Sequence, residues 1–414
     1  MDGFNLDRRL QTGFRTPTEV QKALIPVLLK GENAVVSAPT GSGKTLAYIL
    51  PALHRFAMQE GQRQHHYPKI FVLSPTKELA QQLYGVIKPL AANVGLKTVL
   101  LQGGGMRAQE RTRLRKGADV VIATPQRAYD YMRERTFDVK SVRYVVIDEA
   151  DMMLDMGFVG IVGAFLEKMS PKVQKVMVSA TVTRRVLELA KAVMGRFKRI
   201  ELTPPGKIAP TIRQQLYPCV KSRKAQLVDK LIKQHGWGRV LLFVRKKETA
   251  DALYEALQAF DLRADVLHGE RKHDDRRRVL QRFKEGRVDV LIATDIVARG
   301  LDIEGLEAVI SYDIPHVKHD FIHRVGRTGR AGKEGTAVTL VSVEEMEQLN
   351  DLAELLGEKI EEVILPEYAP KIVKARGWLI MPPQRLHRKN ISKPKRERDP
   401  KNPRGKKRKT RKRG

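Results

Sequence analysis

The stretch from Ala38 to Thr45 reads APTGSGKT and has the residue types of a phosphate-binding loop. Gly41 and Gly43 allow the backbone to bend so that its amide N–H groups point at an anion. Lys44 can then reach the β and γ phosphates, and the Thr45 hydroxyl can bind Mg²⁺. Ala38 replaces the first glycine of the general pattern, so the match is to a variant. The stretch predicts that the chain binds a nucleoside triphosphate.

Acidic residues follow a second apolar run, YVVI, roughly 100 residues after this loop. Asp148, at the end of that run, is placed to hold Mg²⁺ directly or through water. Glu149 can orient or deprotonate a water that faces the γ phosphate. A plain acidic turn would have the same composition, but the apolar run and Lys44 favour the catalytic interpretation. The two patterns together predict nucleotide hydrolysis.

The second half of the chain supplies arginines instead of a second phosphate loop. Arg324, Arg327 and Arg330 recur every three residues in HRVGRTGR, and Asp302 lies in the earlier stretch ATDIVARGLDI. A guanidinium brought against a transferring phosphoryl group is worth roughly 10³ to 10⁵ in rate. Arginines that reach ATP only when two domains close would make hydrolysis depend on closure. An exposed helix with salt bridges is the alternative interpretation.

The phosphate-binding loop and the acidic residues after it are expected at the ends of buried strands. Short apolar, β-branched runs alternate with helical runs, which predicts a parallel, doubly wound α/β sheet. The expected strands of the first half are residues 33–37, 69–73, 97–101, 119–124, 144–148 and 175–179, and the expected helices include 18–28, 45–56 and 77–84. Ligands of such a sheet gather at the carboxyl ends of its strands.

The second half repeats the first at a constant offset. KELAQQLY at 77–84 matches KETADALY at 247–254, and DVVIAT at 119–124 matches DVLIAT at 289–294. Two matches at one offset predict a duplicated α/β unit, although chance similarity of two Val- and Ile-rich strands is the alternative. The Pro- and Gly-rich stretch TPPGKIAPT indicates a linker. We therefore expect an ATP-binding domain at 1–203, a linker at 204–211, a second domain at 212–368 and a tail at 369–414.

The charge of the chain is concentrated in that tail. The whole chain carries a net charge of +30, and residues 371–414 hold 19 Lys and Arg against two acids. This composition predicts a disordered segment that attracts a polyanion, because phosphates reward such charge through counterion release. A solubilising tail is the alternative, and GKKRKTRKR also fits a nuclear import signal. The single cysteine, Cys219, and the absence of a long apolar run favour a soluble protein in a reducing compartment with no membrane partner.

With these segments collected, the chain resembles the DEAD-box ATP-dependent RNA helicases from residue 13 to about residue 370. The matching motifs stand in the family's order: GFRTPTEVQ (13–21), APTGSGKT (38–45), SPTKELA (74–80), the glycines at 103–105, TPQR (124–127), DEAD (148–151), SAT (179–181), LLFVRKK (241–247), ATDIVARGLDI (293–303) and HRVGRTGR (323–330). The resemblance implies two tandem RecA-like domains and an enzyme that couples RNA-stimulated ATP hydrolysis to local separation of short RNA duplexes or to remodelling of RNA–protein complexes.

The resemblance also implies a role for each matching residue. The residues implied to bind ATP are Phe14, Gln21, Ala38, Pro39, Thr40, Gly41, Ser42, Gly43, Lys44, Thr45 and Asp302. The implied catalytic residues are Lys44, Asp148, Glu149, Arg327 and Arg330, with Mg²⁺ on Thr45 and Asp148. The residues implied to couple the nucleotide site to the RNA site are Asp151, Ser179, Thr181 and His323. The residues implied to contact RNA are Pro75, Thr76, Lys77, Gly104, Thr124, Arg127 and Thr294.

Three positions depart from the family pattern. Lys77 replaces an arginine, so a bidentate phosphate contact becomes a point charge. Gln126 stands where the family usually has glycine, and His273 where glutamine is common. None of them is a hydrolytic residue, so we expect these changes to affect the grip on RNA and not the ATPase.

Within the family, CVKSRKAQLVDKLI (219–232) and LLGEKIEEVILPEYAP (355–370) look most like the bacterial RhlE-like subgroup. That likeness implies a role in ribosome assembly or RNA turnover, with ribosomal precursor particles or RNA-decay enzymes as partners. It also implies a cytoplasmic location, or a nuclear one in a eukaryote. Two other functions fit parts of the sequence: a DNA translocase of the same wider superfamily, and a nucleotide-gated RNA clamp that is not an enzyme.

Overall fold

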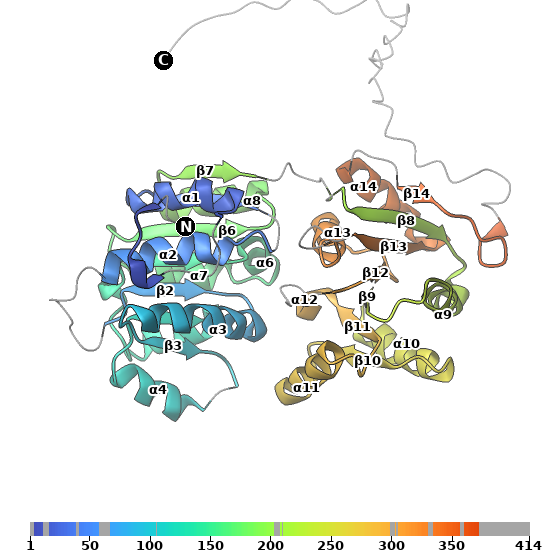
Figure 1. The fold of residues 1–414 in the computed structure, drawn as a ribbon, viewed down its shortest axis with the longest axis horizontal. Helices are drawn as coiled ribbons and strands as arrows, with labels where there is room; N and C mark the ends of the chain where they lie inside the picture. The colour runs from blue at the N-terminus through green and yellow to red at the C-terminus, as the bar shows by residue number, and fades with distance from the viewer. Residues whose placement is uncertain are drawn as a thin grey trace, which may run out of the picture.

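The predicted two-domain α/β architecture is confirmed by the computed structural model. The structure describes residues 4–10, 16–38, 41–57, 67–104, 106–202, 208, 210–298, 303, 305–329, 334–356 and 360–371. Two seven-stranded parallel sheets form two lobes that face each other (Figure 1). Five of the expected site residues lie outside the described residues: Phe14, Pro39, Thr40, Asp302 and Arg330. Most of the expected linker and the basic tail from residue 372 onward lie outside them as well.

The first sheet has the strand order β3-β4-β2-β5-β6-β1-β7. Its strands are β1 (Ala34–Ser37), β2 (Ile70–Leu73), β3 (Thr98–Leu101), β4 (Val120–Ala123), β5 (Tyr144–Ile147), β6 (Gln174–Ser179) and β7 (Lys198–Glu201). The central strands are buried along their whole length because helices cover both faces, which explains why they read as unbroken apolar runs. Only the edge strand β7 is largely exposed.

Helices pack on both faces of this sheet. They are α1 (Glu19–Leu29), α2 (Lys44–Ala57), α3 (Lys77–Asn93), α4 (Arg107–Arg115), α5 (Pro125–Arg133), α6 (Ala150–Asp155), α7 (Val159–Glu167) and α8 (Arg184–Met194), with short 3-10 turns η2 (Arg8–Leu10) and η3 (Val139–Ser141). One core cluster includes residues of α1, α2 and α3, and a second includes residues of α4 to α8. Thr76 caps α3 by accepting the Leu79 N–H, and Pro125 begins α5, where its missing N–H costs nothing.

The second sheet has the order β10-β11-β9-β12-β13-β8-β14. Its strands are β8 (Ile212–Pro218), β9 (Val240–Val244), β10 (Ala264–Leu267), β11 (Val290–Thr294), β12 (Ala308–Ser311), β13 (Gly335–Val341) and β14 (Glu361–Glu362). Its helices are α9 (Lys224–His235), α10 (Lys247–Ala259), α11 (His273–Lys284), α12 (Asp295–Ala298), α13 (Lys318–Val325) and α14 (Met346–Leu356), with 3-10 turns η4 (Lys221–Arg223) and η6 (Val343–Glu345).

The two sheets have equivalent strand orders, as a duplicated unit requires. β2 and β9 occupy the same central place, and β4 and β11 pair with them in the same way. α3 and α10 both begin at a lysine directly after the equivalent strand. Within the described part of the chain, no helix is both long and apolar enough to cross a lipid bilayer.

Candidate functional site

The phosphate-binding loop lies between β1 and α2, at the carboxyl edge of the first sheet. Gly41 and Gly43 have φ angles of 80° and 90°, in the left-handed region that favours glycine. A Cβ atom on Gly43 would lie 2.6 Å from the Gln21 amide nitrogen, so this position also needs glycine for space. The sequence pattern therefore folds into the sharp strand-to-helix turn that it predicted.

Gln21 is buried and bonded to this loop. Its Nε2 donates to the Gly43 carbonyl oxygen at 3.3 Å, and its Oε1 accepts the Thr18 N–H at 3.0 Å. The side chain thus caps α1 and ties that helix to the loop. These bonds leave one N–H and part of the carbonyl oxygen for another partner. The contact of Gln21 with adenine stays a prediction.

Lys44 and Asp148 meet beneath the loop. The Lys44 ammonium donates to the Ala38 carbonyl oxygen at 2.8 Å, and the Tyr48 hydroxyl donates to Asp148 Oδ2 at 3.1 Å. Burial raises the pKa of Asp148 to about 7, the charge of Glu149 adds to this rise, and the charge of Lys44 opposes it. The Tyr48 hydroxyl also interacts with the Thr45 side chain, and a buried carboxylate and a threonine hydroxyl are oxygen donors of the kind that suits Mg²⁺. These residues therefore fit the expected cation, and Tyr48 is a neighbour that the sequence reasoning missed.

Glu149 has an unusual backbone conformation. Its φ and ψ angles are 51° and 54°, in the left-handed region, although it is not glycine. Such a conformation costs about 1–3 kcal/mol and is concentrated at functional sites. The residue stands directly before α6, and its N–H donates to Asp148 Oδ1 at 3.1 Å. This strain is consistent with the role of catalytic base, which stays a prediction.

The four expected coupling residues form one buried cluster. Asp151 Oδ2 accepts the Thr181 N–H at 3.1 Å and the Thr181 hydroxyl at 2.9 Å, and the Ser179 hydroxyl donates to the Thr181 carbonyl oxygen at 2.7 Å. His323 Nε2, from α13 of the second domain, lies 3.5 Å from the same Asp151 oxygen. Burial raises the pKa of Asp151, but the hydrogen bond and charge of His323 outweigh burial and hold that pKa well below its usual range. The cluster therefore joins the two domains.

The arginines after His323 do different things. Arg327 is buried, and its Nε donates to the His323 carbonyl oxygen at 3.1 Å, which places it beside the cluster. Arg324 is fully buried and forms a bidentate ion pair with Asp295 at 2.6 and 2.7 Å. Arg324 therefore anchors α13 to α12 and does not face the first domain.

A cavity of about 310 Å³ opens between the domains at the ends of β2 and β4. Its lining includes five of the residues that we expected to contact RNA: Pro75, Thr76, Lys77, Thr124 and Arg127. The second domain contributes Gly269, Arg276 and Val297. Thr294 ends β11 and is half-buried, but it is not part of this lining.

An ion pair that the sequence reasoning missed closes one side of the cavity. Arg276 Nη1 of α11 lies 3.0 Å from Glu78 Oε1 of α3, and both side chains are largely buried. The signal in the sequence was weak, because Arg276 belongs to a run of three arginines and Glu78 to a helix with many polar residues. Together with the contact between Asp151 and His323, this pair connects the two facing lobes.

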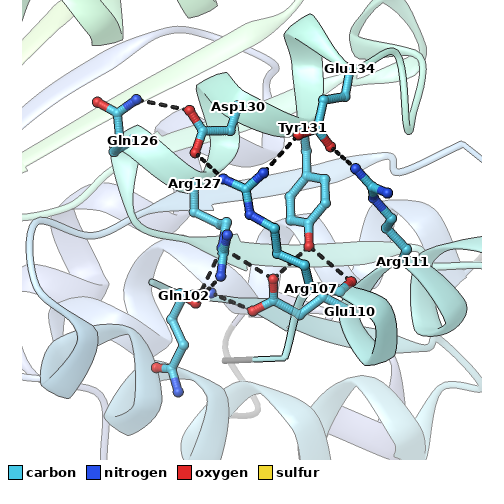
Figure 2. A network of polar contacts seen from close by, with 9 residues as sticks. All are labelled: Gln102, Arg107, Glu110, Arg111, Gln126, Arg127, Asp130, Tyr131 and Glu134. Atoms are coloured by element: carbon cyan, nitrogen blue, oxygen red, sulfur yellow. Dashed lines mark hydrogen bonds and ion pairs between the residues drawn. The ribbon is translucent and has the colours of Figure 1, made fainter. Parts of the chain in front are cut away.

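Arg127 has a position that differs from its expected role. Its side chain is 7% exposed, and its guanidinium lies 3.2 Å from Glu110 Oε2 and donates to the Gln102 carbonyl oxygen (Figure 2). The guanidinium therefore faces the protein, and only part of the side chain reaches the cavity. In this structure Arg127 supports the cavity wall, and a direct contact with RNA phosphate stays a prediction.

Comparisons with known proteins establish the family. The DEAD/DEAH box helicase model matches residues 18–189, and the helicase conserved C-terminal domain model matches residues 223–332. The ATP-dependent RNA helicase RhlB of Vibrio vulnificus is 34% identical over 320 residues, which are 76% of this chain and 73% of that protein. The chain belongs to the DEAD-box ATP-dependent RNA helicases. The ATP-dependent RNA helicase p62 of Drosophila melanogaster is also 34% identical over 320 residues, but there the chain spans only 44% of the relative's length.

Solved structures of other DEAD-box proteins match both lobes. Dbp5 of S. cerevisiae bound to RNA and ADP BeF3 has a TM-score of 0.79 at 27% identity, covering 88% of this chain and 95% of that chain. A Dbp5 variant bound to nup159, gle1, ip6 and ADP has a TM-score of 0.60 at the same identity. The chain therefore shares the two-lobed fold of these proteins.

Family membership confirms the predicted activity at its general level. The chain is an RNA-dependent ATPase with ATP-dependent RNA helicase function. The phosphate loop predicted a nucleoside triphosphate, and family membership identifies it as ATP. Among the described residues, no cluster of three or more His, Cys, Asp or Glu is arranged so that it could hold a metal ion.

Proposed function

We propose that this DEAD-box helicase separates short RNA duplexes locally, or remodels RNA–protein complexes, when its two domains close on ATP and RNA. The observation that carries the proposal is the buried cluster of Asp151, Thr181 and His323. It begins three residues after Asp148 at the nucleotide site, and its histidine belongs to the second domain. A change at the nucleotide can therefore alter how firmly the domains hold together.

The residues of the first domain bind and activate the nucleotide. The amides of the glycine loop and the Lys44 ammonium bind phosphate oxygens, and Glu149 accepts the proton of the attacking water. Mg²⁺, held by Thr45 and Asp148, would neutralise charge that develops on the phosphates. Arg327 and Arg330 bring positive charge from the second domain. Hydrolysis by this arrangement requires that the lobes be closed.

RNA lies over the cavity between the domains in this proposal. Pro75, Thr76 and Thr124 present backbone and hydroxyl groups there, and Lys77 supplies a point charge for a phosphate. Contacts of this kind recognise phosphate and 2′-OH groups, so the selectivity for base sequence should be low. A strand bent over two lobes cannot remain in a regular duplex.

We also propose a role in ribosome assembly or RNA turnover in the bacterial cytoplasm. The support is the likeness of residues 219–232 and 355–370 to RhlE-like members, and the match to RhlB proteins from bacteria. Ribosomal precursor particles or RNA-decay enzymes would be the partners. RNA species crosslinked to the protein in its own cell provide the test, and enrichment of RNAs unrelated to both processes would contradict the assignment.

The activity itself is tested by phosphate release from the full chain. We expect polyuridylate RNA to stimulate ATP hydrolysis strongly and polythymidylate DNA of equal length to stimulate it little. Lys44→Ala is the matched inactive control, since it removes the ammonium that binds phosphate. Equal stimulation by DNA would favour a DNA translocase. Absence of stimulation by any nucleic acid would favour a clamp without enzymatic activity.

The basic tail is proposed to add affinity for RNA without taking part in hydrolysis. Deletion of residues 371–414 should weaken RNA binding and flatten its dependence on salt, because fewer counterions are released. The ATPase rate at saturating RNA should stay unchanged. An unaltered salt slope would reduce the tail to a solubilising segment.

A further inference from the structure

Gly103, in the loop from Gln102 to Gly104, lines the cavity, and this loop packs closely against Lys77. A Cβ atom on Gly103 would lie 3.2 Å from Lys77 Cε, and one on Gly104 would lie 3.1 Å from Lys77 Nζ. Gly104 also has a φ angle of 84°, which a residue with a side chain rarely adopts. Consecutive glycines, three of them in the sequence at 103–105, have a mobile backbone unless neighbouring groups hold it. Something must therefore fix this loop if it is to present a defined surface.

Glu110 provides that restraint from beneath the loop. Its side chain is 5% exposed, and its Oε1 accepts the Gln102 N–H at 3.0 Å. Its Oε2 lies 3.2 Å from Arg127 Nε, and Arg127 in turn donates to the Gln102 carbonyl oxygen through Nε and Nη2 at 3.3 and 3.2 Å. Both backbone polar groups of Gln102 are thus held, one directly and one through the arginine (Figure 2).

The carboxylate is itself held in place by α5. The Tyr131 hydroxyl donates to Glu110 Oε2 at 2.7 Å. Burial and this hydrogen bond raise the pKa of Tyr131 well above its usual value, so the hydroxyl stays a donor. On the exposed side, Arg107 and Arg111 of α4 form ion pairs at 2.9 and 2.7 Å with Glu134, the residue directly after α5. Figure 2 shows these two layers side by side, with the buried layer alone reaching Gln102.

We propose that Glu110 is a positioning residue for RNA binding, acting through the backbone of Gln102 to Gly104. The inference rests on the proposed function, in which RNA lies over the cavity that this loop lines. Glu110 is too buried to touch RNA itself. By holding the loop before RNA arrives, it lowers the ordering cost that binding would otherwise carry. Arg127 serves the same purpose, which explains why its guanidinium faces inward.

The test is Glu110→Gln in the full chain, with ATPase activity measured against the concentration of polyuridylate RNA. Gln retains an acceptor for Gln102 but removes the charge that holds Arg127. We expect the RNA concentration for half-maximal stimulation to rise about tenfold. The rate at saturating RNA and the affinity for a fluorescent ADP measured without RNA should change less than about twofold. A purely structural defect would raise the RNA requirement and also lower both the rate at saturating RNA and the affinity for ADP.

Glu134→Gln is the matched control, since it breaks the exposed ion pairs between the same two helices and leaves Gln102 untouched. It should change the RNA requirement less than about twofold. If Glu110→Gln raises the requirement no more than this control, the proposal is overturned. Tyr131→Phe provides a milder variant that keeps the carboxylate and Arg127, and it should raise the requirement about threefold.

Thermal unfolding without RNA shows whether Glu110→Gln folds. If it does not fold, the test rests on Tyr131→Phe alone. An RNA requirement of Tyr131→Phe equal to that of the unmodified chain would then overturn the proposal. Failure of the proposed function would look different. In that case RNA would not stimulate the unmodified chain at all, or DNA would stimulate it as strongly as RNA.

Discussion

The two domains share one sheet topology but use the lysine after their first strand in opposite ways. Lys44 begins α2 and contacts the carbonyl oxygen of Ala38 within its own loop. Lys224 begins α9, the helix that follows β8 in the second domain. Its ammonium donates to the carbonyl oxygens of Tyr312 and Leu340 and to Glu345 Oε2, at 2.6, 3.1 and 2.5 Å, and it is 1% exposed.

This difference shows that equivalent positions in the two domains of a duplicated fold can have different roles. In the first domain, β5 is followed by Asp148, which faces the loop and its lysine. In the second domain, the equivalent strand β12 is followed by Tyr312, whose carbonyl oxygen accepts from Lys224. Protein groups in the second lobe fill the place that, in the proposed function, phosphates take in the first. Lys224 therefore stabilises the fold, whereas Lys44 is proposed to bind the nucleotide.

The largest effect should come from the nucleotide side of the comparison. Glu149→Gln removes the proposed base and should lower the RNA-stimulated turnover by about 10² to 10⁴. ATP binding should persist, because the loop and Lys44 are unchanged, and the closed state on RNA should accumulate. Phosphate release and retention of labelled RNA measure these effects. Unchanged phosphate release would remove Glu149 from the role of base.

On the structural side, Lys224→Met should destabilise the second domain. It leaves Glu345 buried without its partner, which costs about 3–5 kcal/mol. Thermal unfolding measures the loss, and the double variant Lys224→Met with Glu345→Met should recover most of it. If Lys224→Met were as stable as the unmodified chain, the ion pair of Lys224 and Glu345 would not be what stabilises the second domain at this position.

The ion pair of Lys224 and Glu345 should also make the stability of the second domain depend on pH. Burial raises the pKa of Glu345, but the charge and hydrogen bond of Lys224 outweigh burial and depress it below the ordinary value of 4.5. A carboxyl group whose pKa is lower in the folded state stabilises the fold above its unfolded pKa. This stabilisation is lost as the pH falls through the folded pKa. Unfolding measured from about pH 5 downward should therefore show a loss of stability in the unmodified chain that is absent from the double variant.

A smaller effect is expected where the domains meet. His323→Ala removes the partner of Asp151 across the domain boundary, and we expect about a tenfold loss of RNA-stimulated rate. The affinity for ATP should stay unchanged, because the residue lies outside the phosphate loop. His323→Asn, which retains a donor, should recover part of the rate. A proportional loss of ATP affinity would mean that the cluster belongs to the nucleotide site alone.

The smallest effect is expected from the ion pair between Glu78 and Arg276. Single substitutions to Gln should each raise the RNA requirement about two- to fivefold, and the double variant should be no worse than either. Arg277→Gln is the matched control, since it breaks the exposed pair with Asp274 on the same helix. If the effects of the two single variants on the RNA requirement simply added up in the double variant, the pair of Glu78 and Arg276 would not join the lobes.

Much of the fold followed from local patterns. The strands expected at 69–73 and 175–179 are observed as β2 and β6 within one residue, since buried parallel strands read as unbroken apolar runs. The edge strand β7 was missed, because its sequence KRIE is charged and exposed. It forms through backbone pairing with β1, for example from the Lys198 N–H to the Asn33 carbonyl oxygen at 2.8 Å, and no side-chain pattern records such pairing.

The sequence alone determined the chemistry that is local in the chain. Glycines at 41 and 43, a lysine at 44 and acids at 148 and 149 act through backbone conformation and reach, so their order was enough to predict a nucleotide site. Where each arginine points was decided only by the tertiary structure, because the partners come from distant segments. Arg127 pairs with Glu110 of another helix, and Arg324 pairs with Asp295, 29 residues away. A buried charge takes the nearest opposite charge in space, and the sequence does not show which one that is.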